Sequence, residues 1–157
     1  MLKWPFFRDD KSVPRAAYAA IVAQARNPEF YARLGVPDTI DGRFDMIVLH
    51  LVLVLSRLRD QGDAAAALAR GLTEALVSDM DDNLRELGVG DLAVPKRIRE
   101  MVSGLNGRIA AYERGLADPG GQALEVALEN NLYGTVPVVE PAARARMAAY
   151  MRREAAA

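Results

Sequence analysis

An almost uninterrupted apolar run, Met46 to Leu55, constrains the fold more than any other feature, because only His50 within it is polar. A membrane-spanning helix needs about 20 apolar residues, so this run is too short to cross a bilayer. Its β-branched residues leave a strand open, since periodicity alone does not assign a short apolar run. Length and flanks favour a helix over residues 39–60, with Asp38 as N-cap and Gly62 as C-terminal stop. We therefore predict a buried central helix in an all-α domain.

Two long amphipathic helices, over residues 63–87 and 95–116, are predicted to cover this central helix. Each carries apolar residues at intervals of three or four, which form one stripe along a helix. The first stripe consists of Leu72, Leu76, Met80, Leu84 and Leu87, and the second of Ile98, Met101, Val102, Leu105, Ile109 and Tyr112. Shorter helices are expected after Pro14, Pro28, Gly121 and Pro141. Gly104 and Gly107 weaken the second long helix, so we expect them to mark a close approach of another helix.

The 157 residues fit one domain with three parts. Residues 1–13 form an N-terminal arm, residues 14–132 the core, and residues 133–157 a connection and a last helix. The arm contains Trp4, Phe6 and Phe7, and we expect it to pack back on the domain because exposed apolar patches are uncommon in monomers. Contact with lipid or with a partner is the alternative for this arm.

The composition excludes several classes of function. The chain has no cysteine, which removes thiol nucleophiles and thiolate metal sites. One histidine cannot supply the two Glu-x-x-His pairs of a di-iron bundle. There is no Gly-rich phosphate-binding motif. A net charge of −1 gives no reason to expect recognition of nucleic acid. We therefore predict a protein without catalytic residues, metal or cofactor.

Acidic residues occupy the C-terminal part of the helix 63–87, where the helix dipole disfavours negative charge. Three of them, Asp79, Asp82 and Glu86, lie on one line of the helix, and Asp81 lies beside them. The following helix has the opposite anomaly, because its first turns contain the cations Lys96, Arg97 and Arg99. The simplest interpretation is that the two groups neutralise each other across a short loop. The alternative is a charged edge on which a partner docks, since exposed ion pairs add little stability.

His50 shares one seam of the central helix with Arg43 and Arg57, because the three residues follow at intervals of seven. Buried polar groups usually have a hydrogen-bond partner, so a histidine at the edge of the core, paired with a neighbour or a water, is the structural interpretation. A contact with an anion or a partner is the functional one. A pocket beside His50 that binds a small ligand or serves an enzyme is the rival hypothesis.

Two stretches, Tyr31 to Arg59 and Leu76 to Met101, carry a family resemblance. They contain, in order, the pieces Gly-Val-Pro-Asp, Gly-Arg-Phe-Asp, Asp-Met-Asp-Asp and Val-Pro-Lys. In these pieces the chain resembles the ubiquinol-cytochrome c reductase assembly chaperone family, whose mitochondrial members help newly made cytochrome b to mature. The resemblance implies an all-helical, non-enzymatic assembly factor with cytochrome b as its client. A small companion protein or the ribosome is a further partner that the resemblance implies.

The resemblance and the charge anomalies together give a hypothesis for the client surface. We expect Asp79, Asp82 and Glu86, with the seam of Arg43, His50 and Arg57, to border it. The start of the chain lacks a secretory signal and the character of a transit peptide, so we expect a bacterial cytoplasmic protein at the inner face of the membrane, with peripheral membrane proximity and without a transmembrane segment. A structural subunit of a larger assembly is the third class considered.

Overall fold

Residues 10–157 are described by a computed structural model, and within this range the chain forms helices, turns and loops without a strand. The helices are α1 (Ser12–Ala25), α2 (Pro28–Ala32), α3 (Ile40–Leu58), α4 (Asp63–Glu86), α5 (Val94–Ala117), α6 (Gln122–Asn131) and α7 (Pro141–Ala156). The prediction of an all-α domain is confirmed. Trp4, Phe6 and Phe7 lie outside the described residues, so the packing of the N-terminal arm stays a prediction.

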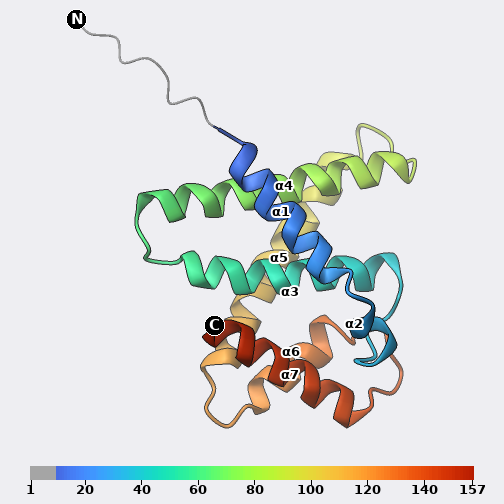
Figure 1. Cartoon of the computed structure of the whole chain (residues 1–157). Coiled ribbons are helices and arrows are strands. Elements are labelled where there is room, and N and C mark those ends of the chain that lie inside the picture. Colours follow the sequence, from blue (N-terminus) through green and yellow to red (C-terminus); the bar gives the residue numbers. More distant parts are fainter. Residues whose placement is uncertain (1–9) are drawn as a thin grey trace, which may run out of the picture.

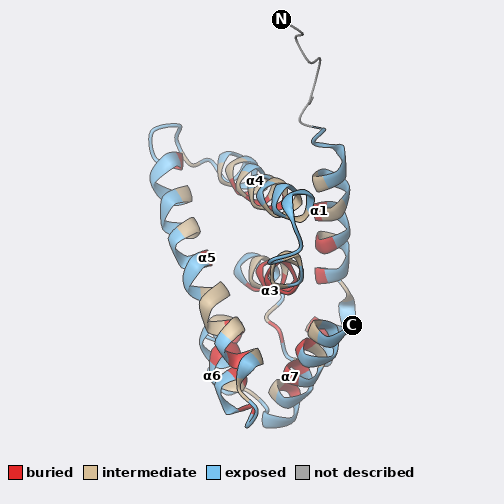
Figure 2. Ribbon diagram, turned by 90° about the vertical axis from the view of Figure 1, so that its left-hand side faces the viewer, coloured by how far each residue is buried: buried red, intermediate tan, exposed pale blue. Residues whose placement is uncertain are grey.

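Helix α3 lies at the centre of the molecule. In Figure 2 it is viewed almost along its axis, with α4, α1 and α5 around it and with α6 and α7 on its remaining side. Met46, Val48, Leu49, Leu51 and Val52 of α3 have no exposed surface, so the helix is buried on nearly every side. Figure 1 shows α1 crossing over α3 and α4, which run antiparallel. The predicted central helix is therefore confirmed.

The two ends of α3 differ from the prediction. Thr39, and not Asp38, is the N-cap: its hydroxyl accepts a hydrogen bond from the Gly42 nitrogen at 3.1 Å. Asp38 forms an ion pair with Arg43 instead, at 2.8 Å. At the C-terminal end Asp60 takes a left-handed conformation with φ of 58°, which Asp tolerates better than most residues. Gly62 lies two residues after Asp60 and is the N-cap of α4.

The stripe of α4 is buried as far as its helical geometry continues. Leu72, Leu76 and Met80 are buried against the core, and Leu84 is half-buried. Leu87 is 61% exposed, contrary to the prediction, because α4 ends at Glu86 and Leu87 no longer follows the helical face. Gly88 ends the helix as predicted, with a positive φ of 82°.

Close helix contacts occur at glycines other than the predicted pair. A Cβ atom added to Gly104 or Gly107 would meet nothing within 4 Å, so the prediction of close packing there is wrong. A Cβ on Gly115 would lie 2.6 Å from the Cα atom of Leu124, which shows that α5 and α6 are tightly packed at this glycine. Gly42 packs instead against the segment just before α3, since its Cβ would lie 2.0 Å from the carbonyl oxygen of Pro37.

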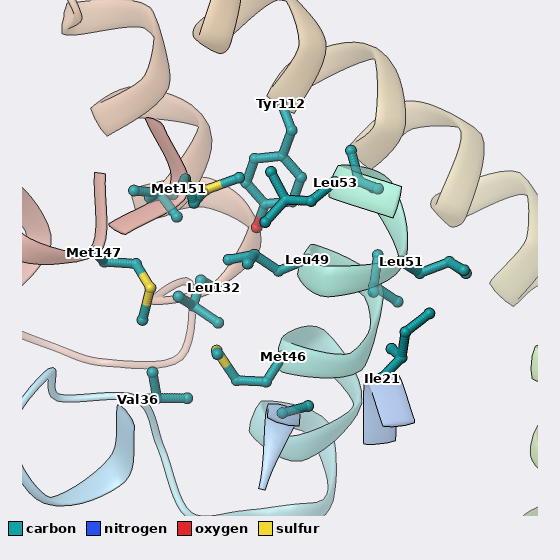
Figure 3. Packing of buried hydrophobic residues seen from close by; sticks show 14 of the residues in the cluster. Ile21, Val36, Met46, Leu49, Leu51, Leu53, Tyr112, Leu132, Met147 and Met151 are labelled. Carbon is teal, nitrogen blue, oxygen red and sulfur yellow. The ribbon is translucent and has the colours of Figure 1, made fainter. Parts of the chain in front are cut away.

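The core continues from α3 into the layer formed by α6 and α7. Figure 3 shows Met147 and Met151 of α7, with Tyr112 of α5 and Leu132, around Leu49 of α3. All five side chains are buried. None of the helices in residues 10–157 combines the length and the apolar character that a bilayer crossing requires.

Candidate partner-binding surface

Helix α4 forms a wall between two surface grooves. The first, the α1–α4 groove, has a volume of about 330 Å³ and is bordered by Tyr18, Asp79 and Asp82. The second, the α3–α4–α5 groove, has a volume of about 770 Å³. Glu74 and Ser78 line both grooves. The acidic end of α4 therefore lies next to two open concave surfaces.

Asp79 accepts two hydrogen bonds at the α1–α4 groove. The Tyr18 hydroxyl donates to Asp79 Oδ2 at 2.6 Å, and the Asn83 side chain donates to Oδ1 at 3.3 Å. Burial, together with the neighbouring carboxylate, raises the pKa of Tyr18, so its hydroxyl stays protonated and remains a donor. Asp82 and Glu86 are exposed. Asp79 thus joins α4 to α1, whereas Asp82 and Glu86 face solvent.

The acids of α4 and the cations of α5 do not neutralise each other. Arg85 pairs with Asp81 at 2.8 Å and also contacts Asp91 in the loop. Arg97 pairs with Glu100 of its own helix, at 4.0 Å. Among the described residues no ion pair joins the acidic group (Asp79, Asp81, Asp82, Glu86) to the basic group (Lys96, Arg97, Arg99). The interpretation of mutual neutralisation is therefore wrong, because Asp81 pairs with Arg85 of its own helix and Arg97 pairs with Glu100 of its own helix.

The α3–α4–α5 groove was not predicted. Its apolar surface comes from Leu55 of α3, Val77 of α4 and Ile98 of α5, and charged residues at its border include Arg70 and Asp81. The three helices that bound it are visible in Figure 2. Val77 lies beside the apolar stripe of α4 and is only half-buried. An apolar residue next to a complete stripe is the sequence signal that could have indicated this groove.

His50 is buried and fully hydrogen-bonded. Its exposed fraction is 6%, its Nδ1 lies 2.8 Å from the Met46 carbonyl oxygen, and its Nε2 lies 2.7 Å from the Tyr150 hydroxyl. A carbonyl only accepts, so Nδ1 carries the proton and Nε2 accepts from Tyr150. The Tyr150 oxygen can then accept from the Gln24 side chain at 3.2 Å. The structural interpretation of His50, pairing with a neighbour, is confirmed.

This set of contacts, which we call the His50 network, joins four helices. The Phe30 ring of α2 packs edge-on against the His50 ring of α3 at 5.4 Å, and Tyr150 and Gln24 belong to α7 and α1. Burial lowers the pKa of His50, which keeps the imidazole neutral at pH 7. Both ring nitrogens are engaged within the protein, so the network serves to hold α7 and α2 against α3.

The other two residues of the seam are exposed. Arg43 pairs with Asp38, and Arg57 donates to the carbonyl oxygen of Ala155 in α7 at 3.4 Å. The structure does not bring this seam into contact with the acids of α4. Helix α1 links the two regions, because Tyr18 bonds Asp79 and Gln24 bonds Tyr150. A direct contact of these residues with a partner stays a prediction.

A second polar contact, between α3 and α5, was also missed. Arg108 pairs with Asp45 at 2.8 Å and lies over the Phe44 ring, with 5.5 Å to its centroid. Burial outweighs the neighbouring guanidinium and raises the pKa of Asp45 to about 6. The sequence signal was Arg108 itself, which follows Leu105 at the helical interval of three and precedes Ile109 on the same apolar face.

Comparisons with known proteins agree with the fold and with the family resemblance. The family model described as "Ubiquinol-cytochrome C chaperone" matches residues 32–157, a range that includes α7 as well as most of the expected core. The "Ubiquinol-cytochrome-c reductase complex assembly factor 1" of Xenopus laevis is 24% identical over 115 residues, which are 73% of this chain and 57% of that protein. The proteins of the corresponding name from mouse and human are each 26% identical over 99 residues, or 63% of this chain.

The chain spans little more than half of the frog protein and about a third of the mouse and human ones, at 57%, 34% and 33% of their lengths. A solved structure, the crystal structure of the Cbp3 homolog from Brucella abortus, is similar over nearly the whole chain. Its TM-score is 0.81 at 36% sequence identity, and the match covers 92% of this chain and 79% of that one. The family match and this structural similarity together show that the chain belongs to the ubiquinol-cytochrome C chaperone family.

Proposed function

We propose that this protein is a non-enzymatic assembly factor of the ubiquinol-cytochrome c reductase, and that it binds newly made cytochrome b before the complex is complete. The observation that carries the proposal is the position of α4 between two grooves in a member of this chaperone family. One groove offers an apolar surface of Leu55, Val77 and Ile98, and Asp79 and Asp82 line the other.

This pairing of surfaces suits a membrane-protein client. Helices of membrane proteins are apolar, and the loops on their cytoplasmic side are enriched in Lys and Arg. An apolar segment can bury surface in the α3–α4–α5 groove while its flanking cations approach the acids of α4. Asp82 and Glu86 are the exposed members of that acidic line, so they are the strongest candidates for direct contact.

The six predicted site residues receive different roles in this proposal. Asp79, Asp82 and Glu86 border the client surface on α4. The exposed residues Arg43 and Arg57 border it on α3, Arg43 near α2 and Arg57 beside α7. His50 lies beneath that surface and positions α7 through Tyr150. The place of action is the inner face of a bacterial cytoplasmic membrane, and a small companion protein or the ribosome is a further partner.

Charge reversal tests the client surface. We expect the variant Asp82→Lys/Glu86→Lys to retain its fold and to capture at least about tenfold less cytochrome b from membranes solubilised in mild detergent, because repulsion replaces attraction at both positions. The matched control is Asp63→Lys/Glu140→Lys, which changes two exposed acids outside both grooves by the same charge. Equal capture by a folded Asp82→Lys/Glu86→Lys variant would contradict this surface.

The assembly function itself is tested in the host. Membranes from a strain that lacks this gene should show reduced haem b absorbance, which the wild-type gene restores and the Asp82→Lys/Glu86→Lys gene restores poorly. Unchanged haem b in a deleted strain that makes the reductase would refute the assembly function. Normal restoration by the variant would refute the role of the acidic residues alone.

A further inference from the structure

The connection between α4 and α5 carries an exposed apolar tip. Leu92 is 98% exposed and Leu87 is 61% exposed. Figure 1 shows this connection arching away from the helices at one edge of the molecule, on the side opposite to α6 and α7. Exposed apolar side chains contribute little to stability, because the stabilisation comes from apolar surface that is removed from water. We call residues 87–99 the hairpin tip.

The hairpin tip also holds cations in an unfavourable place. Lys96, Arg97 and Arg99 lie in the first turns of α5, where the helix dipole disfavours positive charge, and all three are exposed. The acids of α4 do not pair with them. Arg97 has one acidic neighbour, Glu100, at 4.0 Å. Among the described residues Lys96 and Arg99 have no ion-pair partner, so the unfavourable interaction of the cations with the dipole of α5 is only partly compensated.

Within the hairpin tip three cations stand against one acid, Asp91, and Asp91 pairs with Arg85 of α4. Arg85 contacts Asp91 of the loop and Asp81 of α4, so one arginine is shared by two carboxylates, and neither of them pairs with the cations of α5. Glu86 is exposed at the end of α4. The two exposed leucines and the three cations thus lie within the same thirteen residues, and both features call for a partner that is apolar inside and negative at its surface.

We propose that the hairpin tip docks on an anionic lipid surface, with Leu92 and Leu87 inserted among the acyl chains and with Lys96, Arg97 and Arg99 at the headgroups. Stable association of a peripheral protein generally needs two weak signals, an apolar insertion and a basic patch, and the tip supplies both. The long Lys and Arg side chains can keep their charges in the headgroup layer while their stems lie along the apolar boundary. This docking is independent of any client.

Vesicle co-sedimentation of the full chain tests the proposal. Wild-type protein should sediment with vesicles of phosphatidylcholine mixed with phosphatidylglycerol, much less with pure phosphatidylcholine, and less as salt rises because the Debye length shortens. Leu92→Ser should lower the partition coefficient roughly tenfold, which is the order expected for one leucine leaving an apolar environment. The triple variant Lys96→Gln/Arg97→Gln/Arg99→Gln should lower it at least as much and flatten the salt dependence.

Matched controls separate the tip from other contacts. Val138→Ser removes another exposed apolar residue, 84% exposed, and Arg33→Gln/Arg114→Gln/Arg146→Gln removes the same number of exposed cations elsewhere. Neither control should change vesicle binding more than twofold. Trp4→Ser/Phe7→Ser tests the N-terminal arm as the alternative lipid contact.

Three outcomes would overturn the proposal. The first is that wild-type protein does not bind anionic vesicles. The second is that the Leu92→Ser variant binds them as strongly as wild type. The third is that only the variant of the N-terminal arm loses vesicle binding. Loss of client capture in Leu92→Ser with unchanged vesicle binding would identify the hairpin tip as a protein-docking surface instead. Because the vesicle assay contains no client, its result does not depend on the proposed assembly function.

Discussion

His50 in α3 and the cations at the start of α5 both interrupt the pattern that the sequence sets around them, and the structure gives them opposite environments. His50 contacts the Met46 carbonyl and the Tyr150 hydroxyl, and its ring packs against Phe30. The cations of the hairpin tip face solvent, beside leucines that also face solvent. The first anomaly is resolved inside the protein, whereas among the described residues the second has a single internal ion pair, Arg97 with Glu100.

The comparison shows how a structural polar residue can be distinguished from a binding residue when both depart from the sequence pattern around them. A buried polar group costs free energy unless it is hydrogen-bonded, so a complete set of partners indicates a role in stability. Exposed charges set against a helix dipole without partners cost free energy in the isolated protein. The location of compensating partners, and not the anomaly itself, distinguishes a structural residue from a binding residue.

Removal of the His50 side chain should have the largest effect on stability. We expect His50→Ala to lower the free energy of unfolding by about 2–4 kcal/mol, because the Tyr150 hydroxyl loses its acceptor and a cavity opens beside Phe30. Urea unfolding followed by circular dichroism measures this. Arg43→Ala, on the same seam but exposed, should leave the free energy of unfolding nearly unchanged. Similar losses in both variants would remove the distinction between a buried and an exposed seam residue.

Two glycines of α5 provide the next comparison. Gly115→Ala should destabilise the protein by about 1–3 kcal/mol, because its Cβ would lie 2.6 Å from the Leu124 backbone and α6 would have to shift. Gly104→Ala should stabilise it by about 0.5–1 kcal/mol, since nothing lies near its Cβ and alanine is the better helix former. Melting temperatures of both variants, compared with that of wild type, measure these changes in stability. A loss of stability in Gly104→Ala would restore the original prediction of close packing there.

The two buried titratable groups of α3 should give opposite pH dependences. The pKa of His50 is lowered from 6.5, so its contribution to stability is present above pH 6.5 and is lost as the pH falls. The pKa of Asp45 is raised from 3.8 to about 6, so stability falls as the pH rises from about 4 to 6. Urea unfolding across pH 4 to 7.5 should show the first dependence missing in His50→Gln and the second missing in Asp45→Asn. Unaltered profiles would contradict these assignments.

The hairpin tip should give the smallest change in stability. Lys96→Gln/Arg97→Gln/Arg99→Gln removes cations that oppose the dipole of α5, so the free energy of unfolding should rise by up to about 1 kcal/mol. The control Arg33→Gln/Arg114→Gln/Arg146→Gln should give no rise. A destabilised tip variant would show that partners such as Glu100 stabilise these cations by more than the helix dipole destabilises them, and the contrast with His50 would fail.

Local features of the sequence were sufficient to place most helices. The apolar run of α3, the stripe of Leu72, Leu76 and Met80, and the stop at Gly88 each depend on residues close together in the chain. The ends of α3 were less predictable, because Asp38, Thr39, Asp60 and Gly62 are all suitable cap or turn residues. The choice among them depends on small differences in backbone conformation and on the ion pair between Asp38 and Arg43.

The candidate site was predictable only in part. The acids of α4 were found by their conflict with the helix dipole, but the α3–α4–α5 groove was not, because it exists only where Leu55, Val77 and Ile98 of three helices come together. The pairing of Arg85 with Asp81 and Asp91 was overlooked, since it requires the path of the loop after Gly88.

By itself, the sequence determined which segments are helical, which of them is central and which family the chain resembles, because these depend on local periodicity and on ordered short motifs. Only the tertiary structure decided which glycine of α5 packs against a neighbouring helix. It also decided the hydrogen-bond partner of His50, since Tyr150 lies 100 residues further along the chain. The physical reason is that a periodic pattern identifies the apolar face of a helix but not the neighbour that covers it. That neighbour is selected by the packing of all helices at once.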